Sequence, residues 1–114
     1  MDVTSPEFLG YLNQMLNGAV DREFHALSGS FKAGLLRLSE TIEAFGPSGL
    51  QGQYTKHLEG KLWELRIRTP EGIARAIYVA APERRVIIVR IFVKKSQKTP
   101  LSDLQLAKQR MKQV

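Results

Sequence analysis

Apolar residues recur at the spacing of a helix in the first half of the chain. Five of them follow one another in steps of four and three, which places them on one helix face; they are Phe31, Leu35, Leu38, Ile42 and Phe45. Ser30 is predicted to cap this helix, and Gly46 followed by Pro47 ends it. A shorter helix is predicted from an Asn17 cap to Leu27. The two segments form a helical hairpin.

The second half of the chain shows the alternation that is typical of β-strands. In residues 61–68 the apolar side chains point to one face and the charged ones to the other; the charged ones are Glu64, Arg66 and Arg68. Trp63 has the apolar parity and is expected in the core. Residues 72–80 and 84–93 follow short turns, which favour antiparallel neighbours. Residues 9–16 are ambiguous, and we interpret them as a short edge strand.

A closing helix is predicted over residues 100–113, where apolar residues again recur at helical spacing. Thr99 or Ser102 can cap it. The order of elements predicts an α+β fold, with an N-terminal helical hairpin packed on a small, twisted, mainly antiparallel sheet and a C-terminal helix. We expect the helices to cover one face of the sheet. The opposite face then carries the charged side chains of residues 61–68, together with Arg75.

Length and composition limit the classes of protein that fit. A chain of 114 residues predicts one domain, and 43% hydrophobic with 25% charged residues is ordinary for a globular protein. Cysteine is absent, which excludes disulfides, thiolate catalysis and the common zinc sites. The sequence shows neither a membrane span nor a signal peptide, and a cytoplasmic location is expected. The N-terminal SPEF stretch is typical of a cloning remnant, so residues 1–8 carry little weight, and a tag can extend to residue 10.

Positive charge is concentrated in the second half of the chain. Residues 1–55 hold three basic and six acidic residues, a net charge of −3, whereas residues 56–114 hold fourteen basic and five acidic residues, a net charge of +9. Such asymmetry favours a polyanionic partner, most often a nucleic acid. Lysines also gather where the strand over residues 84–93 ends, in the stretch FVKKSQKTP. We interpret this stretch as one wall of a phosphate-binding cleft.

Several stretches together resemble a known family of toxins. KHLEGKLWELRIR, ARAIYV, FVKKSQKTP and DLQLAKQRM, with LNGAVDREFHAL and LLRLSETIEAFG before them, are similar to the HigB-like, phage-derived branch of the RelE superfamily. The resemblance covers residues 11–112. It implies the toxin of a type II toxin–antitoxin module, an endoribonuclease that cleaves mRNA in the ribosomal decoding site. It also implies silencing by a co-encoded helix-turn-helix antitoxin of the HigA type.

Cleavage of RNA without a metal requires a group that stabilises extra charge on the phosphate while protons are moved. Arginine suits this task because its guanidinium is permanently charged and grips phosphate at two points, and lysine acts as a point charge. By resemblance, the catalytic positions fall on Arg66, Arg75, Lys94, Lys95 and Lys98. The further RNA-binding candidates are Arg68, Tyr78, Arg90, Gln97 and His57. We expect neither a metal nor another cofactor, since two histidines without an acidic cluster make a poor metal site.

Structural interpretations of these residues remain open at this point. Arg75 can form an ion pair with Glu64 on the neighbouring strand, and Tyr78 can be packing. Relatives that place tyrosine or histidine near the C-terminus use it for acid–base chemistry, but residues 100–114 contain neither. A second hypothesis is therefore a non-catalytic RNA- or protein-binding module that retains the toxin fold. A helix-turn-helix gene beside this one would favour the toxin.

Overall fold

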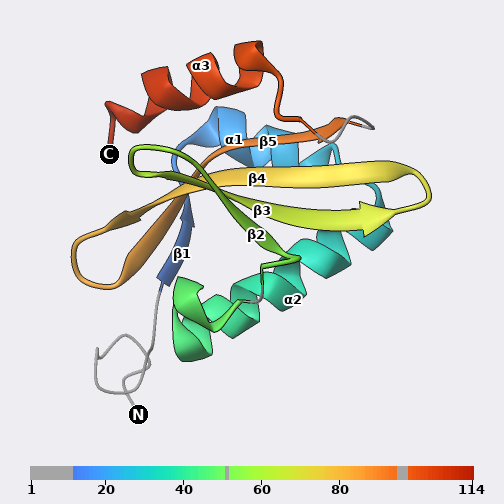
Figure 1. Cartoon of the computed structure of the whole chain (residues 1–114), viewed down its shortest axis with the longest axis horizontal. Coiled ribbons are helices and arrows are strands. Elements are labelled where there is room, and N and C mark those ends of the chain that lie inside the picture. Colours follow the sequence, from blue (N-terminus) through green and yellow to red (C-terminus); the bar gives the residue numbers. More distant parts are fainter. Residues whose placement is uncertain (1–11, 51, 95–97) are drawn as a thin grey trace.

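A five-stranded sheet forms the centre of the structure, a computed structural model that describes residues 12–50, 52–94 and 98–114 (Figure 1). Two helices precede most of the sheet, and a third follows it. The elements are β1 (Leu12–Met15), α1 (Gly18–His25), α2 (Gly29–Phe45), the 3₁₀ turn η1 (Pro47–Gly49), β2 (Thr55–Glu59), β3 (Leu62–Thr69), β4 (Gly72–Ala81), β5 (Arg85–Lys94) and α3 (Leu101–Met111). Among the described residues, none of these helices has the length and apolar content needed to cross a membrane.

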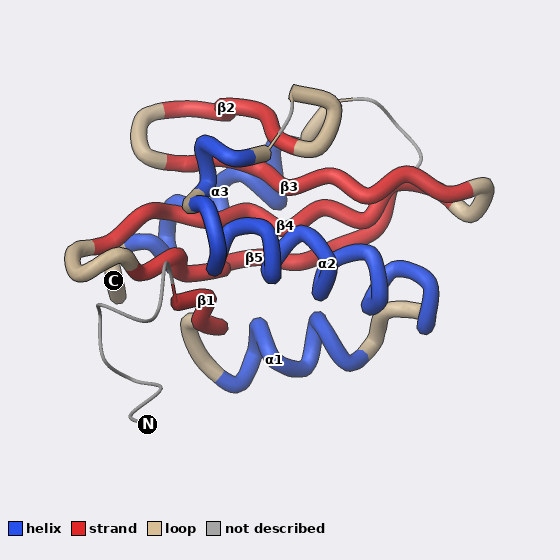
Figure 2. The backbone as a smooth tube through the Cα atoms, turned by 90° about the horizontal axis from the view of Figure 1, so that it is seen from below, coloured by secondary structure: helices blue, strands red, loops and turns tan. Residues whose placement is uncertain are grey.

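The sheet has the strand order β1-β5-β4-β3-β2 and is mainly antiparallel (Figure 2). Strands β2 to β5 pair with their sequence neighbours in antiparallel fashion, as the short turns predict. Strand β1 lies at one edge and pairs parallel to β5, which confirms the predicted edge strand. The other edge, β2, was not predicted. Its sequence TKHLE is polar and mostly exposed, so it lacks the alternation that marked the other strands.

The N-terminal helices begin and end close to the predicted positions. The Asn17 side chain accepts hydrogen bonds from the amides of Ala19 and Val20, which confirms it as the cap of α1. The prediction of a Ser30 cap for α2 is wrong, since α2 already begins at Gly29, after a Ser28 that makes no side-chain cap bond. Gly46 ends α2 with φ at 78°, a conformation that glycine adopts readily.

Helices cover both faces of the sheet, so the prediction that one face is covered is wrong. Figure 2 shows α2 running across one face of the sheet. Val20 of α1 and Phe31, Leu35 and Ile42 of α2 belong to one apolar cluster with residues of the sheet. Helix α3 packs on the other face through Ala107, within a separate apolar cluster that includes Ile77 and Val89 of β4 and β5. Figure 1 shows α3 and α2 on opposite sides of the strands. Helix α3 therefore covers part of the charged face of the sheet.

Two aromatic residues that were expected in the core are partly exposed. Phe45, the last residue of the α2 stripe, is 73% exposed because the chain turns away at Gly46. Trp63 is 40% exposed, although it has the same parity as the buried Leu65. It pairs with His57 of the short edge strand, where the helices do not reach far enough to cover it.

The predicted side-chain caps of α3 are also wrong, since Pro100 occupies the cap position.

Candidate functional site

The strand register brings the predicted basic residues onto one face of the sheet. Three rows run across β3, β4 and β5 on the face that α3 partly covers. The outer row contains Arg68, Ile73 and Lys94; the middle row contains Arg66, Arg75 and Phe92; the inner row contains Glu64, Ile77 and Arg90. Side chains directly opposite on one face approach within about 5 Å at their Cβ atoms. We call these three rows the basic face.

The charged side chains of the outer row are exposed, whereas those of the middle row are buried. Arg68 and Lys94 are exposed, and so is Lys98 in the segment that leads to α3. The Arg66 side chain is 10% exposed, so a small part of it reaches the surface. Arg75 and Glu64 are fully buried. A polyanion that approaches this face thus meets the outer row first and Arg66 next, whereas Arg75 lies beneath the surface.

A single carboxylate holds both central arginines. Oε1 of Glu64 lies 2.7 Å from Nε of Arg66, which donates a hydrogen bond to it, and 3.8 Å from Nη1 of Arg75. A buried charge is tolerated only when it is paired and hydrogen-bonded, so each member of this group permits the burial of the others. The ion pair of Arg75 with Glu64, which the sequence left as one interpretation, is thus present, and Glu64 holds Arg66 as well.

Thr99 completes the buried cluster from outside the sheet. Its hydroxyl donates to Oε2 of Glu64 at 2.8 Å and accepts from Nη1 of Arg75 at 3.2 Å. The sequence suggested a capping role for Thr99, and the structure gives it a bridging one instead. Thr99 precedes Pro100, the cap residue of α3. Its hydrogen bonds therefore connect the start of α3, which partly covers the basic face, to Glu64 and Arg75. We call Glu64, Arg66, Arg75 and Thr99 the buried cluster.

The pKa of Arg75 reflects this enclosure. Burial lowers it from the ordinary value of 12.5, the charge of Glu64 raises it, and the like charges of Arg66 and Arg68 lower it further, so the net shift is downward. The guanidinium still carries its charge, because arginine is not deprotonated in proteins. Arg75 thus contributes a fixed positive charge under the surface, opposite the slightly exposed Arg66 on the neighbouring strand.

Arg90 takes part in a second network at the inner end of the basic face. Its guanidinium contacts Glu23 of α1 at 2.7 Å and Asp103 of α3 at 2.9 Å, and Arg110 of α3 also contacts Glu23. Burial alone would raise the pKa of Glu23, but hydrogen bonds from Arg110 and the Ile91 amide, with the charges of Arg90 and Arg110, produce a net lowering. Two carboxylates therefore hold Arg90, which is consistent with a role in joining α1 and α3 to β5.

Two other RNA-binding candidates lie apart from the basic face. Tyr78 has the opposite parity to Arg75 on β4, and it is buried, with its hydroxyl 3.2 Å from that of Thr55. His57 pairs with Trp63 across the β2–β3 edge, and its ring lies 4.8 Å from the indole. The structure therefore does not bring Tyr78 and His57 together with the arginines. Lys95 and Gln97 fall outside the described residues.

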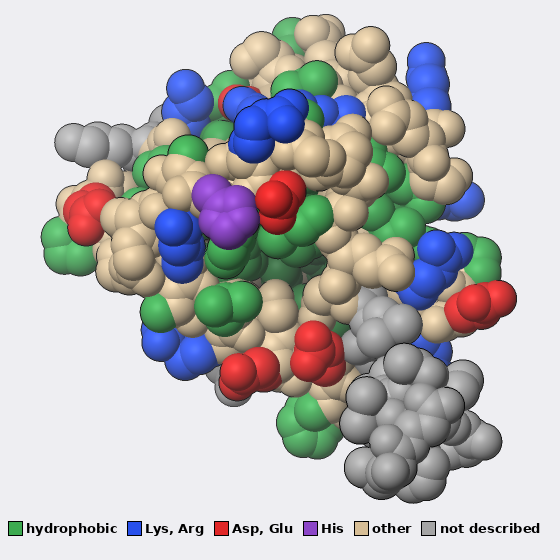
Figure 3. All heavy atoms as spheres, turned by 180° about the vertical axis from the view of Figure 1, so that it is seen from behind, with side chains coloured by type: hydrophobic (Ala, Val, Ile, Leu, Met, Phe, Trp, Pro, Cys, Tyr) green, Lys and Arg blue, Asp and Glu red, His purple; other side chains and the backbone are tan. Residues whose placement is uncertain are grey.

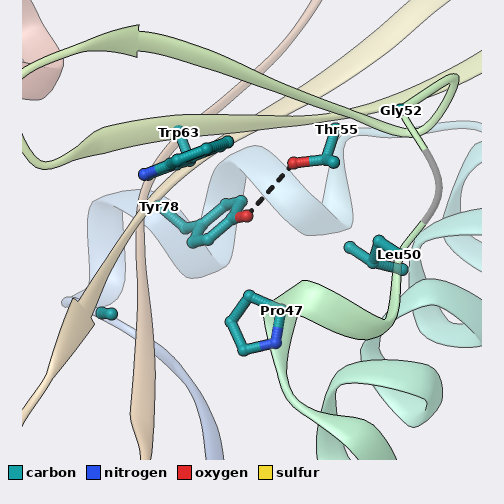
Figure 4. Close-up of a pocket in the computed structure, with 7 residues that line it drawn as sticks. Pro47, Leu50, Gly52, Thr55, Trp63 and Tyr78 are labelled. Atoms are coloured by element: carbon teal, nitrogen blue, oxygen red, sulfur yellow. Dashed lines mark hydrogen bonds between the residues drawn. The ribbon is translucent and has the colours of Figure 1, made fainter.

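An apolar pocket lies beside Trp63 and Tyr78, on the α2 side of the sheet (Figure 4). It has a volume of about 510 Å³, and its other wall is formed by Pro47 and Leu50 of the η1 segment.

The view from behind shows lysine and arginine side chains interspersed with acidic and hydrophobic ones, without one continuous positive patch among the described residues (Figure 3). The basic face thus remains the best candidate for a site that binds a polyanion.

Comparison with known proteins agrees with the predicted fold. Residues 22–112 match the family described as phage-derived Gp49-like proteins. The structure is similar to that of the E. coli toxin RelE, solved in the free state as a double arginine-to-alanine variant, with a TM-score of 0.65 and 11% identity over 90% of this chain and 98% of that chain. The sequence has no significant match among curated proteins. The predicted RelE-like fold and phage-derived family are confirmed.

Proposed function

Since the chain belongs to the family of phage-derived Gp49-like proteins and has a RelE-like fold, we propose that it is the toxin of a type II toxin–antitoxin module. In this proposal it acts in the cytoplasm as a metal-independent endoribonuclease that cleaves mRNA on the ribosome. The observation that carries the proposal is the basic face. Its register places Arg66 directly opposite the buried Arg75, in the row next to the exposed Arg68 and Lys94.

The proposed reaction is attack of a ribose 2′-oxygen on the adjacent phosphorus. The new O2′–P bond forms while the P–O5′ bond breaks, so the 2′-hydroxyl gives its proton to water and the departing 5′-oxygen takes one from a lysine. Arg66 stabilises the extra negative charge on the phosphate, because its guanidinium is held in place by Glu64 before the substrate arrives. Arg75 acts as a positioning residue, since its complete burial keeps it from touching RNA in this structure.

The exposed lysines supply binding and a transferable proton. Lys94 lies in the outer row, and Lys98 lies in the segment between β5 and α3. In this proposal both lysines bind backbone phosphates of the RNA next to the phosphate that Arg66 contacts. We assign protonation of the 5′-oxygen to these lysines, together with Lys95 by its position in the sequence. Arg68 binds the backbone at the outer row. The ribosome fixes the mRNA conformation, which increases the rate by orienting the 2′-oxygen.

The proposed partner is a helix-turn-helix antitoxin of the HigA type that covers the basic face. A half-chain of net charge +9 attracts acidic side chains, and an antitoxin that inserts them beside Lys94 and Arg68 would exclude RNA by charge and bulk. Co-purification of the two proteins, followed by mapping of protected lysines, tests this arrangement. Protection confined to residues 12–45 would contradict it.

Single-turnover cleavage on programmed ribosomes tests the catalytic proposal. Arg66→Ala should slow cleavage by about 10²–10³-fold, the typical loss when one preorganised donor is removed. Arg66→Lys should recover only part of that rate, because lysine cannot grip phosphate at two points. Arg84→Ala is the matched control, since Arg84 is exposed in the turn at the far end of the β4–β5 hairpin from Lys94. Cleavage by Arg66→Ala at the parental rate would refute the assignment.

A second function is favoured by one specific observation. Glu64 engages both Arg66 and Arg75, and the structure places Tyr78 and His57 away from the basic face, so an evident acid–base pair is not assembled there among the described residues. This favours a non-catalytic RNA- or protein-binding module that retains the fold. The two functions separate when the parental protein is induced in cells. Growth arrest with mRNA cut inside reading frames supports the enzyme, whereas arrest with intact mRNA supports the binding module.

A further inference from the structure

A groove lies next to the basic face, between α2 and the end of β3 that extends beyond its pairing with β2. It has a volume of about 430 Å³ and is lined from α2 by Gly34, Arg37, Leu38 and Thr41. Tyr54, Ile67 and Arg68 line its other side. None of these lining residues is acidic. Arg68 also belongs to the outer row of the basic face, so the groove and the basic face share a residue.

Among the described residues, the two arginines of the groove have no carboxylate partner, unlike the arginines of the buried cluster. Arg37 and Arg68 are exposed, and neither forms an ion pair with another described residue. Nη1 of Arg68 donates to the Gln53 carbonyl at 2.7 Å, a neutral partner that leaves its charge uncompensated. Two uncompensated guanidiniums in one groove attract an anion, and phosphate matches their planar donors best.

Tyr54 presents a ring beside these charges, and its backbone is held in place. The Tyr54 carbonyl accepts the Arg66 amide at 2.9 Å, and the preceding carbonyl accepts Arg68, so two arginines of β3 fix the segment. The Tyr54 side chain is 40% exposed. A preordered aromatic ring at the surface is the platform on which single-stranded nucleic acids stack their bases. An acidic peptide would use the charges of the groove but not the ring.

The floor of the groove is set by a close contact between α2 and β3. A Cβ at Gly34 would lie 2.7 Å from Cγ2 of Ile67, so only glycine lets the helix approach the strand this closely. Arg37, Leu38 and Thr41 follow Gly34 at steps of three, four and seven, which places all four on one face of α2. The close approach therefore brings Arg37 to the same groove as Tyr54 and Arg68.

We propose that this groove binds one nucleotide that flanks the cleaved phosphate of single-stranded RNA. The base stacks on Tyr54, and its phosphate lies between Arg37 and Arg68. This inference rests on the proposed function for the identity of the RNA as a substrate. The groove would extend the RNA path from the basic face past the end of β3, and Tyr54 would influence which base is accepted there.

Binding of a ten-nucleotide fluorescein-labelled RNA at two salt concentrations tests the groove without requiring cleavage. Tyr54→Ala should weaken binding about tenfold at either salt concentration, since a stacked base is lost, and Tyr54→Phe should bind like the parent. Arg37→Ala should also weaken binding, and the magnitude of the slope of the logarithm of the binding constant against the logarithm of the salt concentration should fall by about one, the value for one lost phosphate contact. The control Arg84→Ala should change neither quantity. Circular dichroism verifies that each variant is folded. Equal binding by Tyr54→Ala and the parent, or an RNA that the parent does not bind, overturns the proposal.

Crosslinking locates the contact and separates this inference from the proposed function. An RNA with 5-iodouridine, irradiated with the full-length protein, should attach to the peptide that contains Tyr54. Binding and crosslinking that depend on Tyr54 support the nucleotide site in the groove, even if the parent protein does not cleave mRNA. If Tyr54→Ala still cleaves mRNA and gives the same crosslinks as the parent, the groove proposal is refuted and the proposed function stands. A ten-residue polyglutamate peptide serves as the competing ligand. Binding of that peptide, but not of RNA, in a manner that depends on Arg37 would assign the groove to an acidic protein and overturn the proposal.

Discussion

Replacing Glu64 with glutamine should destabilise the protein far more than the loss of an exposed carboxylate charge such as that of Glu59. Glu64 is fully buried, and its carboxylate is the ion-pair partner of Arg66 and Arg75. Glutamine has nearly the same shape and can still bond to Thr99, so the substitution removes the charge and leaves the packing. Two guanidiniums would then face each other across a neutral amide.

The expected magnitude follows from the burial of the pair. Removal of one partner from a buried ion pair costs about 3–5 kcal/mol, because an uncompensated charge remains inside the protein. The retained hydrogen bonds of glutamine favour the lower end, about 3 kcal/mol. For a chain of 114 residues, the entropy of unfolding is about 240 cal/mol/K, so the melting temperature should fall by about 12 °C.

Urea denaturation measured by circular dichroism is the assay, with Glu59→Gln as the matched control. Glu59 pairs with Lys108 at the surface, where both side chains are nearly half exposed, so its loss should cost less than about 1 kcal/mol. The midpoint of Glu64→Gln should fall while the slope of the transition stays the same. The double variant Glu64→Gln with Arg75→Met should lose less free energy of unfolding than the two single variants lose in sum, since it removes both buried charges.

Equal midpoints for Glu64→Gln and Glu59→Gln would refute this reasoning. Such a result would mean that solvent or another group compensates Arg75 in the absence of Glu64. Additive losses in the double variant would likewise show that Glu64 and Arg75 do not interact energetically, whatever their distance.

Further predictions concern pH and packing. The pKa of Glu23 is lowered from 4.5 in the folded state, so the stability it contributes is present above pH 4.5 and is lost as the pH falls through the folded-state pKa; Glu23→Gln should remove this acid dependence in urea titrations at several pH values. Burial raises the pKa of Tyr78 above 10, against the smaller opposing effect of the Thr55 hydrogen bond, so stability is retained below pH 10 and falls as the pH rises toward the folded-state pKa. Thermal melts of Tyr78→Phe should lack that alkaline loss. Gly34→Ala should destabilise by about 1–3 kcal/mol through its contact with Ile67, and adding Ile67→Ala should recover part of the loss in the same urea assay.

The sequence predicts the basic face well because strand parity has a period of two residues. Once residues 61–68 alternate, Arg66 and Arg68 must share a face, and short turns then align the neighbouring strands. The same rule places Trp63 on the apolar side, which is correct, but it does not tell how far the helices extend over that side. Exposure of Trp63 results from the end of α2 at Phe45 and the short edge strand β2, and neither is visible in the alternation of β3.

Depth beneath the surface could not be predicted for the arginines. Parity treats Arg66, Arg68 and Arg75 alike, yet one is exposed, one is nearly buried and one is fully buried. The difference arises from α3 and the segment before it, which bring Thr99 to Glu64 across 35 positions of the chain. A contact at that separation leaves no periodic signal in the sequence. The pairing of Arg75 with Glu64, which was one of two interpretations of Arg75, becomes evident only with the strand register in place.

The buried cluster links stability to the proposed chemistry. Glu64 lowers the cost of burying Arg75, and the same carboxylate oxygen accepts from Nε of Arg66, so it fixes the direction in which the rest of that guanidinium points. A protein that only needed a stable core could replace this cluster with apolar residues of similar volume at little cost. A protein that must present a fixed, partly exposed arginine to a phosphate cannot, because an arginine without a buried carboxylate would sample many rotamers and lose entropy on binding. The cluster therefore supports Arg66, rather than Arg75, as the arginine that meets the phosphate.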